Sequence, residues 1–252
     1  MKLHLVLYSN QEKYEESKKL LMDTVKIFTK YDIVVHDYTL ERIKTCLWFE
    51  KISKLVSIDK LGKRDGYFNS WKPYIIKDVY EILDEDDILY YVDCSKYYIT
   101  GFTESIDKLI DAVSTRTFIA GSVGNNVLNN SYECCDNIDV WNKINPGIDN
   151  EKFLSKMHVL NSWFILKKAE ICHTFINEWV YFTSYSDDEL SLPLVTYHHT
   201  VEQSIFNILA YKYGLTVFYH NDIPHDKNKD RNEVLRALNS AVDANVFFIP
   251  LI

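Results

Sequence analysis

The sequence predicts an α/β protein: one domain with a mostly parallel central sheet and helices on both of its faces. Two observations lead to this prediction. Short apolar runs such as "LHLVLY" (3–8) alternate with segments whose apolar residues recur at helical spacing, such as "QEKYEESKKLLMDTVKIFTK" (11–30). The first half reads strand, helix, strand, helix, helix, strand, and this alternation is typical of parallel sheets covered by helices. With 252 residues, 47% of them hydrophobic, the chain is long enough for one substantial core.

Each further element follows from its own pattern. Apolar runs predict strands at 32–38, 88–93, 117–121, 158–168 and 215–220. Helical spacing predicts helices at 41–58, 72–83, 103–114, 169–185 and 200–214. The segment "SVGNNVLNNSYECCDN" (122–137) is rich in Gly, Asn and Ser, which predicts a long loop near the ligand site. The charge-dense "HDKNKDRNE" (225–233) predicts a mobile surface loop.

The charge balance and the cysteines limit the class of protein. A formal net charge of −8 and a pI of about 5.5 argue against general affinity for nucleic acid, which requires a basic surface. The five cysteines have no metal-binding spacing, so a reducing compartment is expected. No apolar run reaches the roughly 18 residues of a membrane span, and the N-terminus turns polar too soon for a signal peptide. We therefore expect a soluble, cytoplasmic protein with no transmembrane segment and no nucleic-acid partner.

One strand ends on a carboxylate. In "ILYYVDCSKYY" (88–98), the apolar run stops at Asp93. A buried strand needs no charge at its end, but ligands and metals bind at the carboxyl ends of central α/β strands. Asp93 is therefore the first candidate for a functional residue.

Four stretches in this order resemble a known family: "DGYFNSWKPYIIKDVYEIL", "DEDDILYYVDCS", "AGSVGN" and "HHTVEQSIFNILAYKYG". They are similar to segments of the GT-A type of nucleotide-sugar glycosyltransferases, particularly the small enzymes of bacterial surface-polysaccharide clusters and large DNA viruses. The resemblance covers about residues 60–215. It implies a single Rossmann-like GT-A domain over 1–252, with a nucleotide-binding half at 1–120 and a donor-sugar and acceptor half at 121–252. It also implies transfer of a sugar from a nucleotide-sugar donor, expected to be UDP-linked, to a saccharide or glycan acceptor. A viral source is compatible with it.

The resemblance further implies a Mn²⁺ or Mg²⁺ ion held by Asp93 against the donor diphosphate. Members of the family usually have a second carboxylate two residues later, where this chain has Ser95. Ser95 is a weak or water-mediated candidate ligand. His220 and His225, which follow the last predicted strand, are candidates to replace the second carboxylate.

Donor-binding residues are expected at the ends of predicted elements. Lys72, in Trp-Lys-Pro at the start of a helix, and Arg64, in the loop before it, are candidates for the diphosphate. The alternatives are a solvated lysine and a surface arginine. Tyr8 and Ser9 end the first strand and are candidates for the nucleotide base, although Tyr8 is equally compatible with a core residue.

The donor sugar and the acceptor require polar side chains and, for one stereochemical outcome, a base. Asn161 and Gln203 are candidates for the sugar. Glu202 is the candidate base, with Asp136 in reserve, and a base is required only if the anomeric centre inverts. Turn formation by Asn161 and a helix-capping role for Gln203 are the competing interpretations.

Two other functions remain open from the sequence. One is a non-catalytic saccharide-binding or scaffold protein that keeps the fold without the second carboxylate. The other is a nucleotide-sugar hydrolase, in which water replaces the acceptor.

Overall fold

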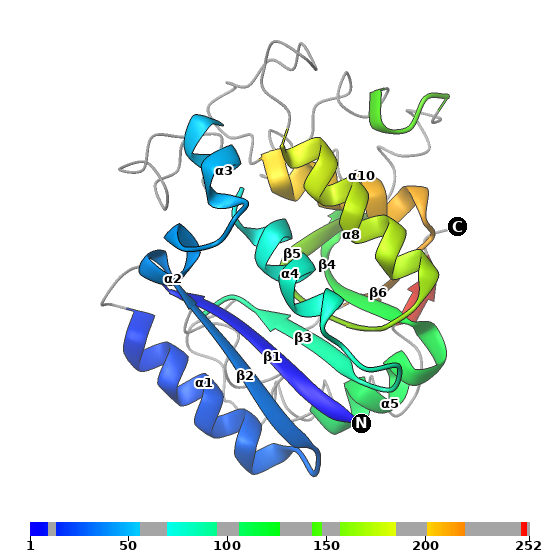
Figure 1. The fold of residues 1–252 in the computed structure, drawn as a ribbon. Coiled ribbons are helices and arrows are strands. Elements are labelled where there is room, and N and C mark those ends of the chain that lie inside the picture. Colours follow the sequence, from blue (N-terminus) through cyan, green and yellow to red (C-terminus); the bar gives the residue numbers. More distant parts are fainter. Residues whose placement is uncertain are drawn as a thin grey trace.

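Seven strands of the described chain form one mixed sheet, and helices cover both of its faces (Figure 1). The computed structural model describes residues 1–9, 14–55, 70–94, 106–126, 143–147, 157–184, 201–219 and 248–250. The strands are β1 (Lys2–Ser9), β2 (Asp32–Thr39), β3 (Ile88–Val92), β4 (Phe118–Asn126), β5 (Met157–Lys167), β6 (Thr216–Tyr219) and β7 (Phe248–Pro250). The helices are α1 (Glu15–Phe28), α2 (Leu40–Lys44), α3 (Phe49–Leu55), α4 (Lys72–Glu81), α5 (Ile106–Arg116), α8 (Glu170–Thr183) and α10 (Val201–Lys212). No helix in these ranges is long and apolar enough to cross a membrane.

The strands follow the order β2-β1-β3-β5-β4-β6-β7. β1 pairs in parallel with β2 and β3, and β4 pairs in parallel with β6, whereas β3 with β5, β5 with β4, and β6 with β7 are antiparallel. The α/β class and the helices on both faces are confirmed. The prediction of a mostly parallel sheet is wrong, because β5 runs antiparallel between β3 and β4. The stretch Trp163–Leu166 of β5 is fully buried on both faces of the sheet, and an apolar run of this kind does not reveal the direction of the strand.

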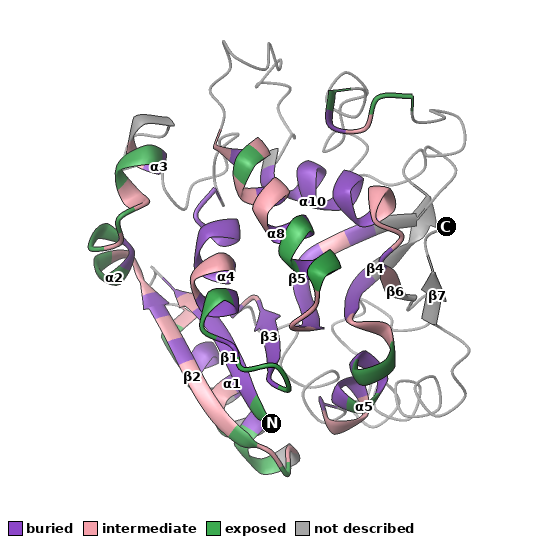
Figure 2. Ribbon diagram, turned by 45° about the vertical axis from the view of Figure 1, so that its right-hand side comes forward, coloured by how far each residue is buried: buried purple, intermediate pink, exposed green. Residues whose placement is uncertain are grey.

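One face of the sheet packs against α1 and α5, and the other packs against α4, α8 and α10 (Figures 1 and 2). Side chains alternate along β1, so Leu5 and Leu7 join the core beneath α1 and α5, while Val6 joins the core beneath α4. In α1, Leu21 and Val25 lie about one turn apart and are both fully buried. Figure 2 shows the buried stretches running through the central strands and the inner sides of the helices.

The predicted helix at 41–58 is instead two short helices. Thr39 caps α2 by accepting a hydrogen bond from the Arg42 backbone N–H, and α2 ends at Lys44. The chain then turns, with Leu47 fully exposed, before α3 begins. Trp48 explains the break, because its Nε1 donates to the Asp78 carboxylate of α4 at 2.7 Å. This tertiary contact outweighs the local helical pattern.

β4 and β7 also differ from the prediction. β4 continues to Asn126, so the first five residues of the predicted loop at 122–137 are strand; the remainder of that loop lies outside the described residues. β7 was not predicted, and the segment at 225–233 lies outside the described residues as well.

Candidate functional site

The order in which successive strands are added to the sheet reverses at β1, between β2 and β3. The connection from β1 leads through α1 to β2 on one side, and the chain then returns to β3 on the other side of β1. In α/β sheets, ligands bind at the carboxyl ends of the strands at such a point. β1 and β3 are paired with Val6 opposite Tyr91, so the same register places Tyr8 beside Asp93. Asp93 therefore lies at this point of the sheet.

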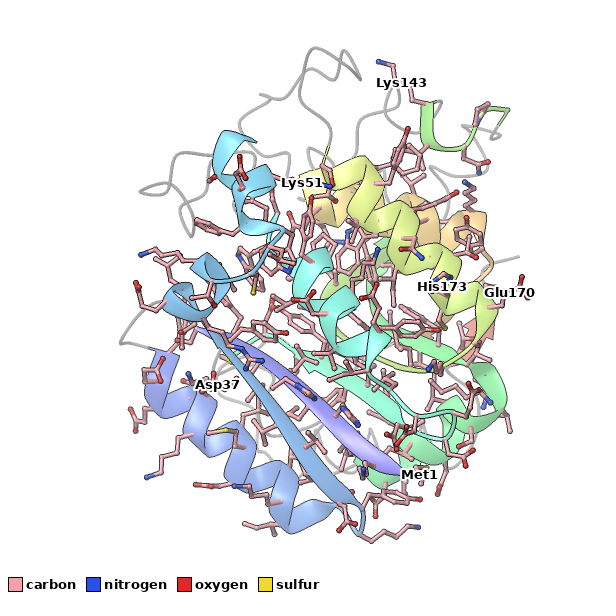
Figure 3. All side chains as sticks on the ribbon, in the orientation of Figure 1. Met1, Asp37, Lys51, Lys143, Glu170 and His173 are labelled. Atoms are coloured by element: carbon pink, nitrogen blue, oxygen red, sulfur yellow. The ribbon has the colours of Figure 1, made fainter. Side chains whose placement is uncertain are left out.

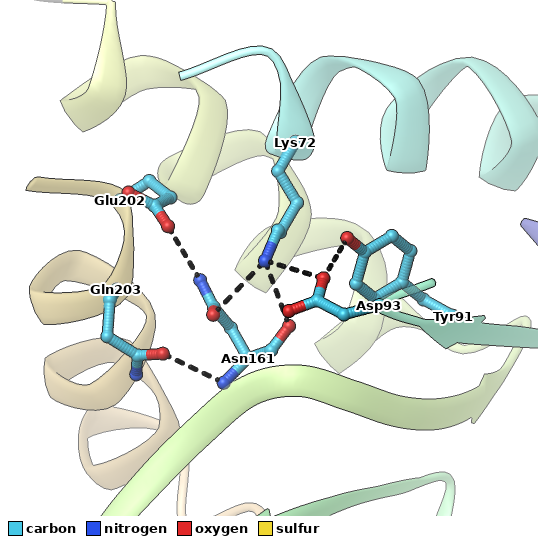
Figure 4. A network of polar contacts seen from close by, with 6 residues as sticks. All are labelled: Lys72, Tyr91, Asp93, Asn161, Glu202 and Gln203. Carbon is cyan, nitrogen blue, oxygen red and sulfur yellow. Dashed lines mark hydrogen bonds and ion pairs between the residues drawn. The ribbon is translucent and has the colours of Figure 1, made fainter. Parts of the chain in front are cut away.

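Asp93 follows β3 directly and is held from two sides (Figure 4). Its Oδ1 accepts hydrogen bonds from Tyr91 Oη at 2.5 Å and from Lys72 Nζ at 3.3 Å. Its backbone N–H donates to the Ser162 carbonyl at 2.7 Å, which ties the end of β3 to β5. Burial, followed by the charge of Asp93, raises the pKa of Tyr91, so this hydroxyl remains a neutral donor. The Asp93 side chain is 36% exposed, and one fixed carboxylate thus reaches the surface of the site.

Lys72 is the first residue of α4, and its side chain is 1% exposed. Its ammonium lies 3.3 Å from each of three acceptors: Asp93 Oδ1, the Asn161 carbonyl oxygen and Asn161 Oδ1. An ammonium has three protons, so each acceptor can be matched by one of them. The ammonium also lies 5.1 Å from the centre of the Tyr91 ring. The alternative of a solvated lysine is wrong.

Asn161 is directed into the site by an irregularity of β5. The pairing of β4 with β5 shifts register between Ala120 and Gly121, opposite residues 161–163 of β5. Val159 packs under α10 whereas Trp163, four residues later, packs under α1 and α5, so the alternation of faces is interrupted between them. Gly121 accommodates this arrangement, because a Cβ atom there would lie 2.4 Å from Trp163 Nε1.

Glu202 and Gln203 lie in the first turn of α10 and contact Asn161. Asn161 Nδ2 donates to Glu202 Oε1 at 3.3 Å, and the Asn161 backbone N–H donates to Gln203 Oε1 at 3.0 Å. The Glu202 carbonyl accepts from Trp179 Nε1 at 2.9 Å, which anchors the start of α10 to α8. Glu202 is 1% exposed and Gln203 is 9% exposed, so both are part of the interior of the site. Thr200, the expected helix cap, lies outside the described residues.

Tyr8 faces the same side of the sheet as Asp93 and pairs with an aromatic neighbour. Its ring stacks on Trp71, with the ring centres 3.8 Å apart. Burial raises the pKa of Tyr8. Tyr8 Oη and Trp71 Nε1 are both buried, and neither has a hydrogen-bond partner in the part of the chain that the structure describes. One face of the Tyr8 ring is thus already used by Trp71.

Ser9 lies on the opposite face and belongs to a separate polar cluster. The hydrogen bond with Ser9, together with Lys18, lowers the pKa of Glu15. Lys18 Nζ lies 3.0 Å from both Glu15 and Asp37. Asp37 lies in the carboxyl-terminal half of β2, far from Met1 at the start of β1 (Figure 3). Ser9 is therefore near the edge where the site lies but is not part of the Asp93 network.

The other predicted site residues, Arg64, Ser95, Asp136, His220 and His225, lie outside the described residues. For a divalent cation, the described chain thus offers the partly exposed Asp93, whose Oδ1 already accepts two hydrogen bonds. Mn²⁺ and Mg²⁺ require several oxygen ligands, and no group of three His, Cys, Asp or Glu side chains that could hold a metal occurs in these ranges. The described residues therefore do not by themselves form a metal site.

Sequence reasoning missed two members of the network. Tyr91 lies two positions before Asp93, so it points to the same face of β3, and that spacing was a usable signal. Asn207 accepts a hydrogen bond from the Val159 backbone N–H at 2.9 Å. Its signal was a polar residue four positions after Gln203, inside the mainly apolar run 205–211 of α10.

Comparisons with known proteins do not identify a family. No family model matches the sequence, and no curated protein matches it. Among solved structures, the chain is similar to the bifunctional IspDF from Campylobacter jejuni, with 11% sequence identity and a TM-score of 0.38. The similarity covers 95% of this chain and 55% of the IspDF chain, so the chain spans about half the length of that protein.

Proposed function

We propose that the protein is a GT-A type glycosyltransferase that transfers a sugar from a nucleotide-sugar donor, expected to be UDP-linked, to a saccharide acceptor. The convergence of five side chains supports this proposal most strongly. Lys72, Asp93, Asn161, Glu202 and Gln203 were each nominated from the sequence, on segments far apart in the chain. They form one hydrogen-bonded network at the carboxyl end of β3.

The leaving diphosphate requires positive charge. Lys72 supplies a fixed, buried ammonium at the first residue of α4, where the helix dipole also favours anions. Preorganised charge of this kind stabilises the charge that develops in a transition state without reorganisation of the protein. Because the ammonium is 1% exposed and its three protons are matched by Asp93 and Asn161, its charge would act on the diphosphate through space, and the donor would contact the exposed part of the Asp93 carboxylate.

The sugar and the acceptor hydroxyl meet Asp93, Asn161 and Glu202 in this proposal. During transfer, the bond between the anomeric carbon and the diphosphate oxygen breaks, and its electron pair leaves with the diphosphate. The acceptor oxygen bonds to the anomeric carbon and loses its proton. If the centre inverts, Glu202 receives that proton, with its Oε1 oriented by Asn161 Nδ2. The acceptor hydroxyl must then enter the buried part of the site beside Asn161.

A divalent cation at Asp93 is a separate part of the proposal, and no step above passes through it. Mn²⁺ or Mg²⁺, when bound, would neutralise diphosphate charge. Asp93 would be one of its ligands, and its orientation would be maintained by Tyr91.

Thermal unfolding with UDP, GDP, CDP and their sugars, each with and without Mn²⁺, tests the proposal. A ligand that binds only the native state raises its stability by about 2.7 kcal/mol at one hundred times its Kd. Wild type, Asp93→Ala and a control, Glu81→Gln, should be compared. Glu81 is an exposed carboxylate of α4, so its loss should leave nucleotide binding unchanged. We expect one nucleotide to stabilise the wild type and the control but not Asp93→Ala.

The outcomes separate the candidate functions. Stabilisation that requires Mn²⁺ would support a metal at Asp93, whereas stabilisation that is indifferent to metal would give the neutralising role to Lys72. Release of nucleoside diphosphate that depends on an added saccharide supports a transferase, and release without one indicates a hydrolase. If no nucleotide stabilises the wild type, the transferase proposal fails and a saccharide-binding or scaffold role is favoured.

A further inference from the structure

The backbone of β5 next to the site is hydrogen-bonded by side chains in the way a neighbouring strand would bond it. The Val159 N–H donates to Asn207 Oδ1 at 2.9 Å, and the Val159 carbonyl accepts from Gln203 Nε2 at 2.7 Å. The Asn161 N–H donates to Gln203 Oε1 at 3.0 Å, and the Asn161 carbonyl accepts from Lys72 Nζ at 3.3 Å. All four backbone groups of two alternate residues are therefore satisfied by three side chains.

The arrangement depends on helix geometry. Gln203 and Asn207 are four residues apart in α10, so their side chains lie on the same face, one turn apart. Residues two apart in a strand are separated by a similar distance along its axis. Two amide side chains on one helix face can thus bond successive backbone groups on one edge of a strand. Amides suit this role because each one carries both a donor and an acceptor.

These bonds hold the backbone on either side of Leu160, and one of the two residues that they hold is Asn161. Asn161 is the residue through which Lys72, Glu202 and Gln203 are connected. Its backbone lies at the register shift of β5, where the regular ladder does not define its direction. Asn207 touches Val159, two residues before Asn161, and it is fully buried.

We infer that Asn207, together with Gln203, is a positioning residue: the face of α10 formed by these two amides replaces a strand along Val159–Asn161 and thereby aims Asn161 into the donor-sugar part of the site. The inference rests on the proposed function for the identity of the ligand, but its structural part does not. Asn207 meets neither sugar nor nucleotide in this scheme. Its loss should therefore disturb recognition of the sugar more than recognition of the nucleotide.

Two variants and one control test this role. Asn207→Leu has a similar size but cannot accept the Val159 N–H, whereas Asn207→Asp retains an acceptor oxygen. The control is Ile208→Ala, which removes a fully buried neighbour of the same helix that belongs to the apolar core. Each protein is examined by hydrogen exchange of the backbone amides over residues 157–163. Binding of UDP and of UDP-glucose is measured under the same conditions by titration calorimetry.

We expect faster exchange at the Val159 and Asn161 amides in Asn207→Leu than in Ile208→Ala, and largely preserved protection in Asn207→Asp. We also expect Asn207→Leu to raise the Kd of UDP-glucose at least fivefold and the Kd of UDP less than twofold. In Ile208→Ala, the ratio of these two Kd values should not change. Unchanged amide protection in Asn207→Leu would overturn the inference whether or not any nucleotide binds. An unchanged ratio of the two affinities would reduce Asn207 to a purely structural residue. If the wild type binds neither probe, the proposed function fails, and hydrogen exchange alone decides whether α10 replaces a strand.

Discussion

Replacement of Lys72 by methionine is the most direct perturbation of the network. Methionine retains most of the apolar stem that α4 buries but removes the ammonium. Three acceptors lose their donor at once: Asp93 Oδ1, the Asn161 carbonyl and Asn161 Oδ1. Asp93 retains its bond from Tyr91 and its contact with solvent.

The magnitude follows from the exposure of each partner. Asp93 is 36% exposed, so the loss of its ion pair is screened and costs about 1 kcal/mol. Asn161 is 4% exposed, and each of its two acceptors left without this donor costs about 1 kcal/mol. The sum is a loss of about 3 kcal/mol in the free energy of unfolding. For a protein of this size, that corresponds to a decrease of about 6–12 °C in Tm.

Lys77→Met is the matched control, because Lys77 lies on the same helix and its ion pair with Glu81 is surface exposed. It should change stability by less than about 0.5 kcal/mol. Urea unfolding followed by circular dichroism measures both variants, and Asp93→Asn with the double variant completes a mutant cycle. If Lys72→Met is as stable as Lys77→Met, the ammonium does not hold the site together.

Three further predictions follow from contacts around the site and from the sheet. Gly121→Ala should destabilise the protein by about 1–3 kcal/mol in urea unfolding, because the new Cβ would meet the buried Trp163 ring at 2.4 Å; stability equal to that of the wild type would show that the ring moves aside at no cost. Burial, followed by the charges of His4 and Arg42, lowers the pKa of His36 to about 4. The unfolded chain therefore binds a proton near pH 6.5 that the native protein does not, and stability should fall by about 3 kcal/mol between pH 6.5 and pH 4. The free energy of unfolding of the wild type and of His36→Asn should be measured over this pH range. It must depend less on pH in the variant than in the wild type. Tyr91→Phe should cost about 1 kcal/mol and weaken nucleotide binding, as measured by thermal unfolding; unchanged values for both would mean that its hydroxyl does not orient Asp93.

Local patterns were sufficient for most elements and nominated several residues of the candidate site. The apolar runs and helical spacing located β1, β3, α1 and α4 within a few residues, because these signals depend on near neighbours in the chain. Asp93 stood out because a charge that ends a buried strand is unusual. Lys72, Asn161, Glu202 and Gln203 were nominated as polar side chains near the ends of predicted elements, and the structure connects all four.

Other features depended on contacts between distant parts of the chain. Trp48 breaks a predicted helix because it bonds to Asp78, thirty positions away. Ser9 was grouped with Tyr8, but strand alternation directs the two side chains to opposite faces of the sheet. The aromatic pairing of Tyr8 with Trp71 likewise joins segments that no short pattern links.

Periodicity and composition are sufficient to predict the α/β class, the two helical layers and the strand that ends on a carboxylate. The tertiary structure alone decided the antiparallel direction of β5, the register shift that turns Asn161 toward Lys72, and the use of Gln203 and Asn207 in place of a strand. The physical reason is that side-chain periodicity reports which face of an element is buried, whereas direction, register and hydrogen-bond partners are set by long-range packing.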